Sequence, residues 1–169
     1  MRLDEYQERV GQFADYPSAV VHGNHVKLVY PVLGLAEEVA ELHEKMQTGA
    51  DRLEISKEIG DVCWFVQEVA SCLGIKMSQL SRTMKTTVTL DVLSGTVCGV
   101  LAKAVRDTDG LLRPRGVDKI IHTLSQILSK VEEVAAEYGF QLEDVMRGNY
   151  NKLASRKSRG VIHGSGDNR

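Results

Sequence analysis

Two consecutive amphipathic segments between residues 33 and 66 constrain the fold of this chain more than any other feature. In both, apolar residues recur at i, i+4, i+7 and i+11, the spacing of one face of an α-helix. The apolar positions are Leu35, Val39, Leu42 and Met46 in the first segment, and Ile55, Ile59, Val62 and Val66 in the second. Because the helix breaker Thr48-Gly49 lies between them, we expect helices at about 32–47 and 52–73 that turn back over 47–51 and pack antiparallel.

Carboxylates lie beside both apolar stripes, at the same offset from each. Glu38 and Glu41 share one side of the first predicted helix, and Glu58 and Asp61 share the corresponding side of the second. In an antiparallel pair these carboxylates converge along one edge, where they repel one another unless a cation lies among them. Oxygen ligands without Cys or His indicate a hard ion such as Mg²⁺ or Mn²⁺. The alternative is a solvated acidic face balanced by neighbours such as Lys45.

The spacing of these acidic residues resembles a known signature. Glu37-Glu38-x-x-Glu41, a spacer of sixteen residues and Glu58-x-x-Asp61 are similar to the EExxE…ExxD pattern of the all-α nucleoside triphosphate pyrophosphatases. That superfamily includes MazG, the dimeric dUTPases and phosphoribosyl-ATP pyrophosphatase. The flanking sequences LGLAEEVAE and KEIGDVCWFV also resemble MazG helices. The resemblance implies an all-α, MazG-like helical bundle.

The same resemblance implies an enzyme that hydrolyses a nucleoside triphosphate to the monophosphate and pyrophosphate, for control of the nucleotide pool. A deoxynucleoside triphosphate is the first candidate. The resemblance also implies that Glu38, Glu41, Glu58 and Asp61 hold two or more Mg²⁺ ions, for which Mn²⁺ substitutes. Such ions neutralise the triphosphate and lower the pKa of a bound water. Glu37 faces another side of its helix, where it either positions or deprotonates the attacking water or is an ordinary surface residue.

The end of the chain resembles the end of MazG-type proteins. An Asn-x-x-Lys-Leu-x-x-Arg pattern puts Asn149, Lys152 and Arg156 on one helical face, and we expect this polar, cationic strip to bind phosphate oxygens. Asn149 or Tyr150 is expected to touch the sugar or base. The glycine-rich tail at 164–169 is similar to the family's tail and either orders over bound nucleotide or stays disordered.

Two more positions are candidates for substrate binding. Lys27 lies in the polar stretch 16–32, which either contacts a base or phosphate or is ordinary polar surface. The stretch also contains His22, Asn24, His25 and Tyr30. Trp64 lies three residues after Asp61, where it either stacks on a nucleobase or fills a core or interface position.

A degenerate copy of the acidic helix pair follows in the sequence, at offsets of 58 and 65 residues. Identical pairs at the second offset are Val66/Val131, Glu68/Glu133, Val69/Val134, Ala70/Ala135 and Gly74/Gly139. We therefore predict a second helix pair, at about 88–105 and 117–138, that completes a four-helix core. Its equivalents of the acidic residues are Thr96, Gly99, Thr123 and Gln126. This copy would bind no metal. Alternatively, the two pairs share only amphipathic periodicity.

The length of 169 residues fits a single domain. Helical spacing of Leu3, Tyr6, Val10 and Phe13 predicts a short first helix over 2–14. We divide the domain into an N-terminal helix and loop at 1–32, the catalytic helix pair at 33–80, the degenerate pair at 88–145, and a phosphate-binding helix end with a glycine-rich tail at 146–169.

The composition argues against several other classes of protein. A net charge of −2 gives no basis for a nucleic-acid surface, and no apolar run approaches the length of a membrane span. Cys63, Cys72 and Cys98 show no CxxC spacing, so we expect buried free thiols in a reducing cytosol and a cytoplasmic protein.

The sequence leaves the assembly and two rival functions open. Because family members associate around their bundles, we expect a homo-oligomer, either a dimer or a tetramer. One rival is another enzyme of the same fold, a phosphoribosyl-ATP pyrophosphatase or a dUTPase that also accepts diphosphates. The other is a non-catalytic helical module for oligomerisation or regulation, with a solvated acidic edge.

Overall fold

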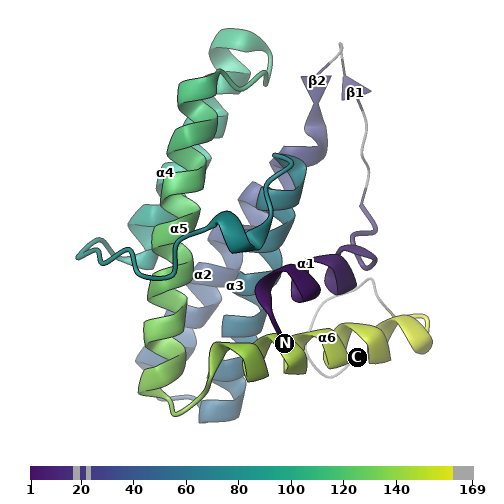
Figure 1. The fold of residues 1–169 in the computed structure, drawn as a ribbon, viewed down its shortest axis with the longest axis vertical. Coiled ribbons are helices and arrows are strands. Elements are labelled where there is room, and N and C mark those ends of the chain that lie inside the picture. Colours follow the sequence, from purple (N-terminus) through teal and green to yellow (C-terminus); the bar gives the residue numbers. More distant parts are fainter. Residues whose placement is uncertain (17–19, 22–23, 162–169) are drawn as a thin grey trace.

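The computed structural model (Figure 1) describes residues 1–16, 20–21 and 24–161 and shows an all-α fold. The elements, in chain order, are α1 (Leu3–Gly11), β1 (Val20–Val21), β2 (Asn24–His25), the 3₁₀ helix η1 (Val26–Leu28), α2 (Val29–Thr48), α3 (Arg52–Cys72), the 3₁₀ helix η2 (Met77–Gln79), α4 (Leu90–Thr108), α5 (Pro114–Glu137) and α6 (Leu142–Ser158). The two short strands pair antiparallel. The predicted helices are confirmed, with ends that differ by a few residues.

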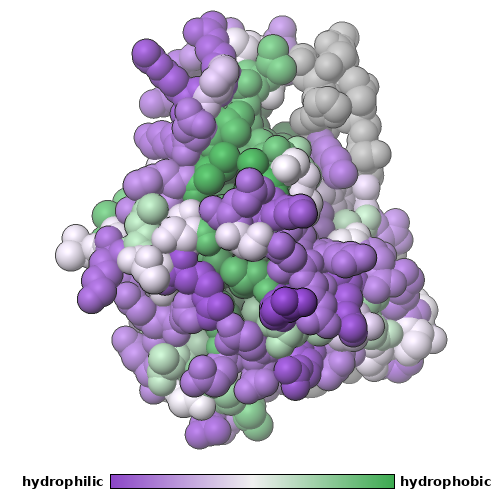
Figure 2. Space-filling model, viewed as in Figure 1, coloured by the Kyte–Doolittle hydropathy of each residue, from purple (hydrophilic) through white to green (hydrophobic). Residues whose placement is uncertain are grey.

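Four long helices form the core. Helix α2 packs on α3, α4 packs on α5, and the two pairs meet through α2 against α4 and α3 against α5. Helices α1 and α6 lie across the bundle, contact each other and both pack on α3 (Figure 1). The predicted apolar stripes are buried, except that Met46 at the end of α2 is only partly buried. Figure 2 shows that the surface on this side is largely hydrophilic, apart from a hydrophobic band along the upper part of α5.

The predicted reversal between the acidic helices is confirmed by its capping. Gly49 ends α2 with φ at 69°, and its backbone N–H and that of Ala50 donate to carbonyls of the last helical turn. Asp51 then caps α3, since its side chain accepts a hydrogen bond from the Leu53 N–H at 2.7 Å. This tight turn holds α2 and α3 antiparallel, so residues of both helices face each other across the seam.

The second helix pair occupies the place predicted for it. Helix α5 begins at Pro114, three residues earlier than expected, because proline suits the first position of a helix. Among the described residues, a single group of acidic side chains is close enough together to hold a metal ion, and it lies on α2 and α3. The described residues of α4 and α5 form no such group. Descent of the two pairs from one duplicated pair stays a prediction.

In the described part of the chain, no helix is both long and apolar enough to cross a membrane. The cysteines are free, as predicted. Burial was expected for all three and holds for Cys63, whereas Cys72 and Cys98 are only partly buried.

Close packing of α2 on α3 depends on Gly34. A Cβ atom at this position would lie 2.1 Å from Cε1 of Phe65. The Phe65 ring is itself confined by an edge-on contact with Trp64, in which the ring centroids lie 4.7 Å apart. We expect Gly34→Ala to lower the free energy of unfolding by about 1–3 kcal/mol, because the buried ring must move. Chemical denaturation measures this change.

Gly95 provides a matched control for this substitution. It lies inside α4 with open space around the position of a Cβ atom, so Gly95→Ala should raise stability by up to about 1 kcal/mol through helix propensity alone. Equal stability of the two variants would show that Phe65 is not confined as described.

Candidate active site

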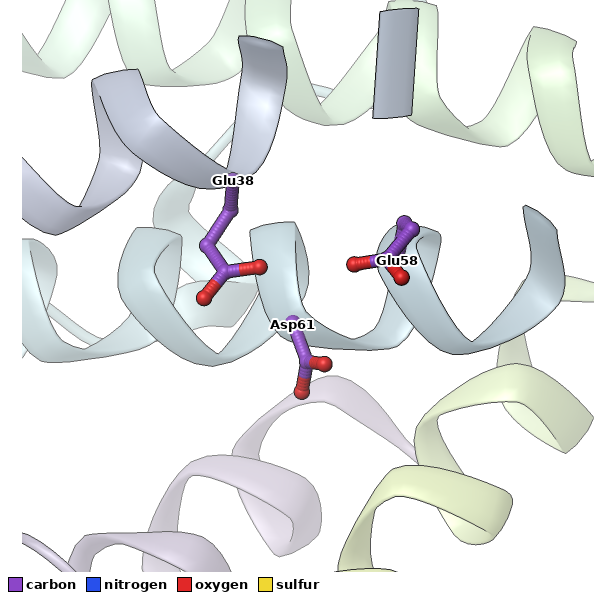
Figure 3. A group of neighbouring side chains, drawn as sticks. All are labelled: Glu38, Glu58 and Asp61. Carbon is purple, nitrogen blue, oxygen red and sulfur yellow. The ribbon is translucent and has the colours of Figure 1, made fainter. Parts of the chain in front are cut away.

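Three carboxylates converge where α2 packs on α3 (Figure 3). Glu38 reaches from α2 toward α3, which carries Glu58 and Asp61 one turn apart. Each side chain offers an oxygen, and these oxygens lie within 4.8 Å of one another. Glu58 is buried, at 2% exposure, and the other two are partly buried. Four carboxylates were predicted to converge, and this group contains three of them.

The electrostatics of the cluster favour a cation. Burial, followed by the charges of Asp61, Glu41 and Glu58, raises the pKa of Glu38 to about 8, and Lys152 partly offsets the rise. Crowded carboxylates of this kind resist ionisation unless positive charge is supplied. Their hard oxygen atoms at this spacing fit Mg²⁺ or Mn²⁺, so the residues present are suited to a divalent ion.

Two lysines balance the carboxylates on α3. Lys45 forms ion pairs with Glu58 and, at 3.3 Å, with Glu54, while Lys152 of α6 pairs with Asp61. These pairs offset the free-energy cost of burying the carboxylates. The sequence suggested Lys45 only as a partner of the acidic residues in the alternative of a solvated face. Its ion pair with Glu58 crosses the turn between the helices, and no local pattern in the sequence shows that contact.

Asp61 also receives a hydrogen bond from α6. Nδ2 of Asn149 donates to Oδ1 of Asp61 at 2.7 Å, and the hydroxyl of Tyr6 on α1 donates to Oδ1 of Asn149 at the same distance. Sequence analysis placed Tyr6 only on an apolar helix face. A buried tyrosine hydroxyl needs a hydrogen-bond partner, and that requirement was the available signal.

A cavity of about 150 Å³ adjoins the carboxylates. Glu38 and Asp61 form one part of its wall, and Arg156, which is buried, forms another. The remaining lining is largely aromatic and comprises Phe13, Tyr16, Tyr30, Trp64 and Phe65, with Asp15 and Leu153. Trp64 was predicted as a candidate contact for substrate, and so was the stretch 16–32, which contains Tyr16 and Tyr30, whereas Phe13 and Phe65 were not. The dimensions and lining suit a flat ring next to a charged group.

The aromatic walls are held by specific contacts. The ring centroids of Tyr16 and Tyr30 lie 4.7 Å apart, and the Tyr16 hydroxyl donates a hydrogen bond to Oε2 of Glu68 at 2.9 Å. Burial raises the pKa of Glu68, against hydrogen bonds from Gln67 and Tyr16 that favour its charged form. Within the described residues, the buried indole N–H of Trp64, one of the residues that line the cavity, has no hydrogen-bond partner.

Several predicted residues lie outside this arrangement. Glu37 and Glu41 are exposed and do not join the three-carboxylate group, although the charge of Glu41 helps to raise the pKa of Glu38. Tyr150 packs against Phe13 with ring centroids 6.0 Å apart, and Lys27 is exposed on η1. Neither Tyr150 nor Lys27 is among the residues that line the cavity. His22 and the tail at 164–169 lie outside the described residues, and the side chains of Asn24 and His25 are not described.

Comparisons with known proteins bear on the same helices. The family model described as the MazG nucleotide pyrophosphohydrolase domain matches residues 31–86, which span α2, α3 and all three clustered carboxylates. The chain is 38% identical over 76 residues to the "Gene 37 protein" of Mycobacterium phage L5, an alignment that covers 45% of this chain and 67% of the phage protein. No solved structure matches the chain. This chain therefore belongs to the MazG-like nucleotide pyrophosphatase family.

Proposed function

We propose that the protein hydrolyses a nucleoside triphosphate, with deoxynucleoside triphosphates as the first candidates, to the monophosphate and pyrophosphate. The observation that carries this proposal is the convergence of Glu38, Glu58 and Asp61 beside an aromatic cavity. Water would attack the α-phosphorus, and the bond to the bridging oxygen of the leaving pyrophosphate would break. A role in control of the nucleotide pool follows from this chemistry.

Glu38, Glu58 and Asp61 are the proposed ligands for Mg²⁺, and the nearby Glu41 is the fourth candidate. A bound divalent ion neutralises the triphosphate and lowers the pKa of water, and Mn²⁺ should replace Mg²⁺. Binding of two or more ions is part of the proposal. Glu37 is proposed to position or deprotonate the attacking water, and its exposure on α2 leaves its side chain accessible to solvent and substrate.

The aromatic cavity is the proposed site of the base. Trp64, which lines the cavity, would stack on the base or donate its indole N–H, which has no partner among the described residues, to a base carbonyl. Arg156, on the same wall, would bind phosphate oxygens as a charge-assisted donor. Lys152 and Asn149 lie against Asp61, from which they would reach the phosphates near the metal. Tyr150 and Lys27 stay candidates for peripheral contacts with the nucleotide.

Release of pyrophosphate tests this function. The purified protein is incubated with each common NTP and dNTP, phosphoribosyl-ATP, dUTP and dUDP, with Mg²⁺ or Mn²⁺ and with EDTA. We expect metal-dependent release with a preferred base, and its loss in the Glu38→Ala variant. Turnover of dUDP or of phosphoribosyl-ATP alone would identify the corresponding rival enzyme. Absence of turnover with every substrate would indicate a non-catalytic module.

Two further properties are proposed, the first on the family resemblance and the second on the free cysteines. The protein should associate as a homo-oligomer, either a dimer or a tetramer, and it should act in the cytoplasm. Sedimentation that shows only an 18.7 kDa species would refute association.

A further inference from the structure

A buried chain of two hydrogen bonds links the N-terminal helix to the carboxylate cluster. Tyr6 on α1 donates to Asn149 on α6, and Asn149 donates to Asp61 on α3. Tyr6 is fully buried and Asn149 is 4% exposed, so water does not compete for these groups. Three helices that are distant in the sequence therefore meet at one carboxylate.

The direction of these two hydrogen bonds fixes the orientation of the side-chain amide of Asn149. The Tyr6 hydroxyl offers one proton, and its short contact at 2.7 Å is with Oδ1 of Asn149, whereas the carbonyl of Gly60 lies 3.4 Å away. With Oδ1 occupied as an acceptor, the amide must present its N–H₂ group to Asp61. A rotated amide would set an oxygen against the Asp61 carboxylate and would leave the Tyr6 proton only the longer contact with the Gly60 carbonyl, which is costly in a buried site.

Both oxygens of Asp61 are held as a result. Asn149 binds Oδ1, and Lys152 binds Oδ2 from the same face of α6. Gly60 makes this approach possible, because a Cβ atom there would lie 2.9 Å from Cβ of Asn149. Helix α6 can therefore come close enough to α3 to orient the carboxylate.

We propose that Tyr6 is a positioning residue for metal binding, which acts through Asn149 to orient the carboxylate of Asp61. The inference rests on the proposed function, since it takes Asp61 as a metal ligand. Partners that orient ligand side chains contribute about 10- to 100-fold to metal affinity in metalloproteins. The Tyr6 hydroxyl itself, and not only the packing of α1, would then contribute to the affinity of the metal site.

Titration of the metal-free protein with MnCl₂ by calorimetry tests the proposal. Tyr6→Phe keeps the buried ring and removes only the hydroxyl, and we expect the Kd for Mn²⁺ to rise about tenfold. Gly60→Ala should raise it similarly, because the new methyl group displaces Asn149 from Asp61. An unchanged Kd in Tyr6→Phe would overturn the proposal.

Two controls separate positioning from general stability. Val10 is fully buried on the same helix and has no polar group, so Val10→Ala should lower the melting temperature and leave the Kd for Mn²⁺ unchanged. Equal weakening in Val10→Ala would mean that Tyr6 acts only by holding α1 in place. Tyr138→Phe, at the C-cap that follows α5, should change neither quantity.

Asp61→Asn separates this proposal from the function on which it depends. If Asp61→Asn abolishes Mn²⁺ binding while Tyr6→Phe does not weaken it, the metal site stands and the role of Tyr6 is wrong. If Asp61→Asn binds Mn²⁺ as tightly as the wild type, the proposed metal site itself is wrong.

Discussion

Asp61→Asn should reduce turnover by at least about a thousandfold, the largest effect that we expect from a single substitution. The change removes one negative charge from a cluster of three carboxylates and one proposed metal ligand. Metal coordination stabilises a phosphoryl-transfer transition state by several kcal/mol, and each 1.36 kcal/mol is worth about a factor of ten in rate. The rate of pyrophosphate release at saturating substrate and metal measures the loss.

Folding should survive this substitution. Asparagine has the size of aspartate and retains Oδ1 as an acceptor for Asn149, and the lost charge relieves repulsion with Glu38 and Glu58. Loss of the ion pair with Lys152 opposes that gain. The melting temperature of the metal-free variant should therefore stay close to that of the wild type.

The metal-induced gain in stability should disappear in the same variant. A ligand at one hundred times its Kd stabilises a folded protein by about 2.7 kcal/mol, so excess Mn²⁺ should raise the melting temperature of the wild type. Asp107→Asn, an exposed change on α4, is the matched control and should keep both the activity and the shift. Retention of activity in Asp61→Asn would show that the site is misassigned.

Without metal, the protein should lose stability as the pH rises from about 4.5 to about 8 because of Glu38. Folding raises the pKa of this carboxyl to about 8 from its ordinary value of 4.5, chiefly through burial and the charge of Asp61. Between these values the folded chain holds a proton that the unfolded chain has released. The stabilising contribution is therefore complete below pH 4.5 and is lost as the pH passes through 8.

Metal binding should reverse this dependence, because a carboxylate ligand must release its proton. We expect the Kd for Mn²⁺ to fall by up to about tenfold per pH unit below 8 and then to level off. Calorimetry in buffers of different ionisation enthalpy should show nearly one proton released per binding event at pH 6.5.

Glu38→Gln isolates the contribution of this carboxyl from those of other titrating groups. The difference in unfolding free energy between wild type and variant should depend on pH in the window from 4.5 to 8 and be constant outside it. Mn²⁺ binding to the wild type without proton release would contradict the assignment of the raised pKa to Glu38.

The helices were predictable because their signals are local. Apolar spacing within the segments around Leu35 and Ile59 predicted α2 and α3, and the breaker Thr48-Gly49 predicted the turn between them. The repeated offset of the carboxylates predicted that Glu38, Glu41, Glu58 and Asp61 would converge. The structure brings three of them together and leaves Glu41 exposed outside the group. Helical periodicity fixes which residues share a face, and the short turn fixes which faces meet.

The sequence by itself therefore determined the helices, their antiparallel pairing and the carboxylate cluster. Only the tertiary structure decided which distant groups surround that cluster, including Tyr6, 143 residues from its partner Asn149, and the ion pair of Lys45 with Glu58. It likewise decided that Tyr16, Tyr30 and Phe65 share one cavity wall with Trp64. The physical reason is that periodicity describes one helix at a time, whereas the angle and closeness at which α1 and α6 cross α3 depend on side-chain packing across the whole bundle.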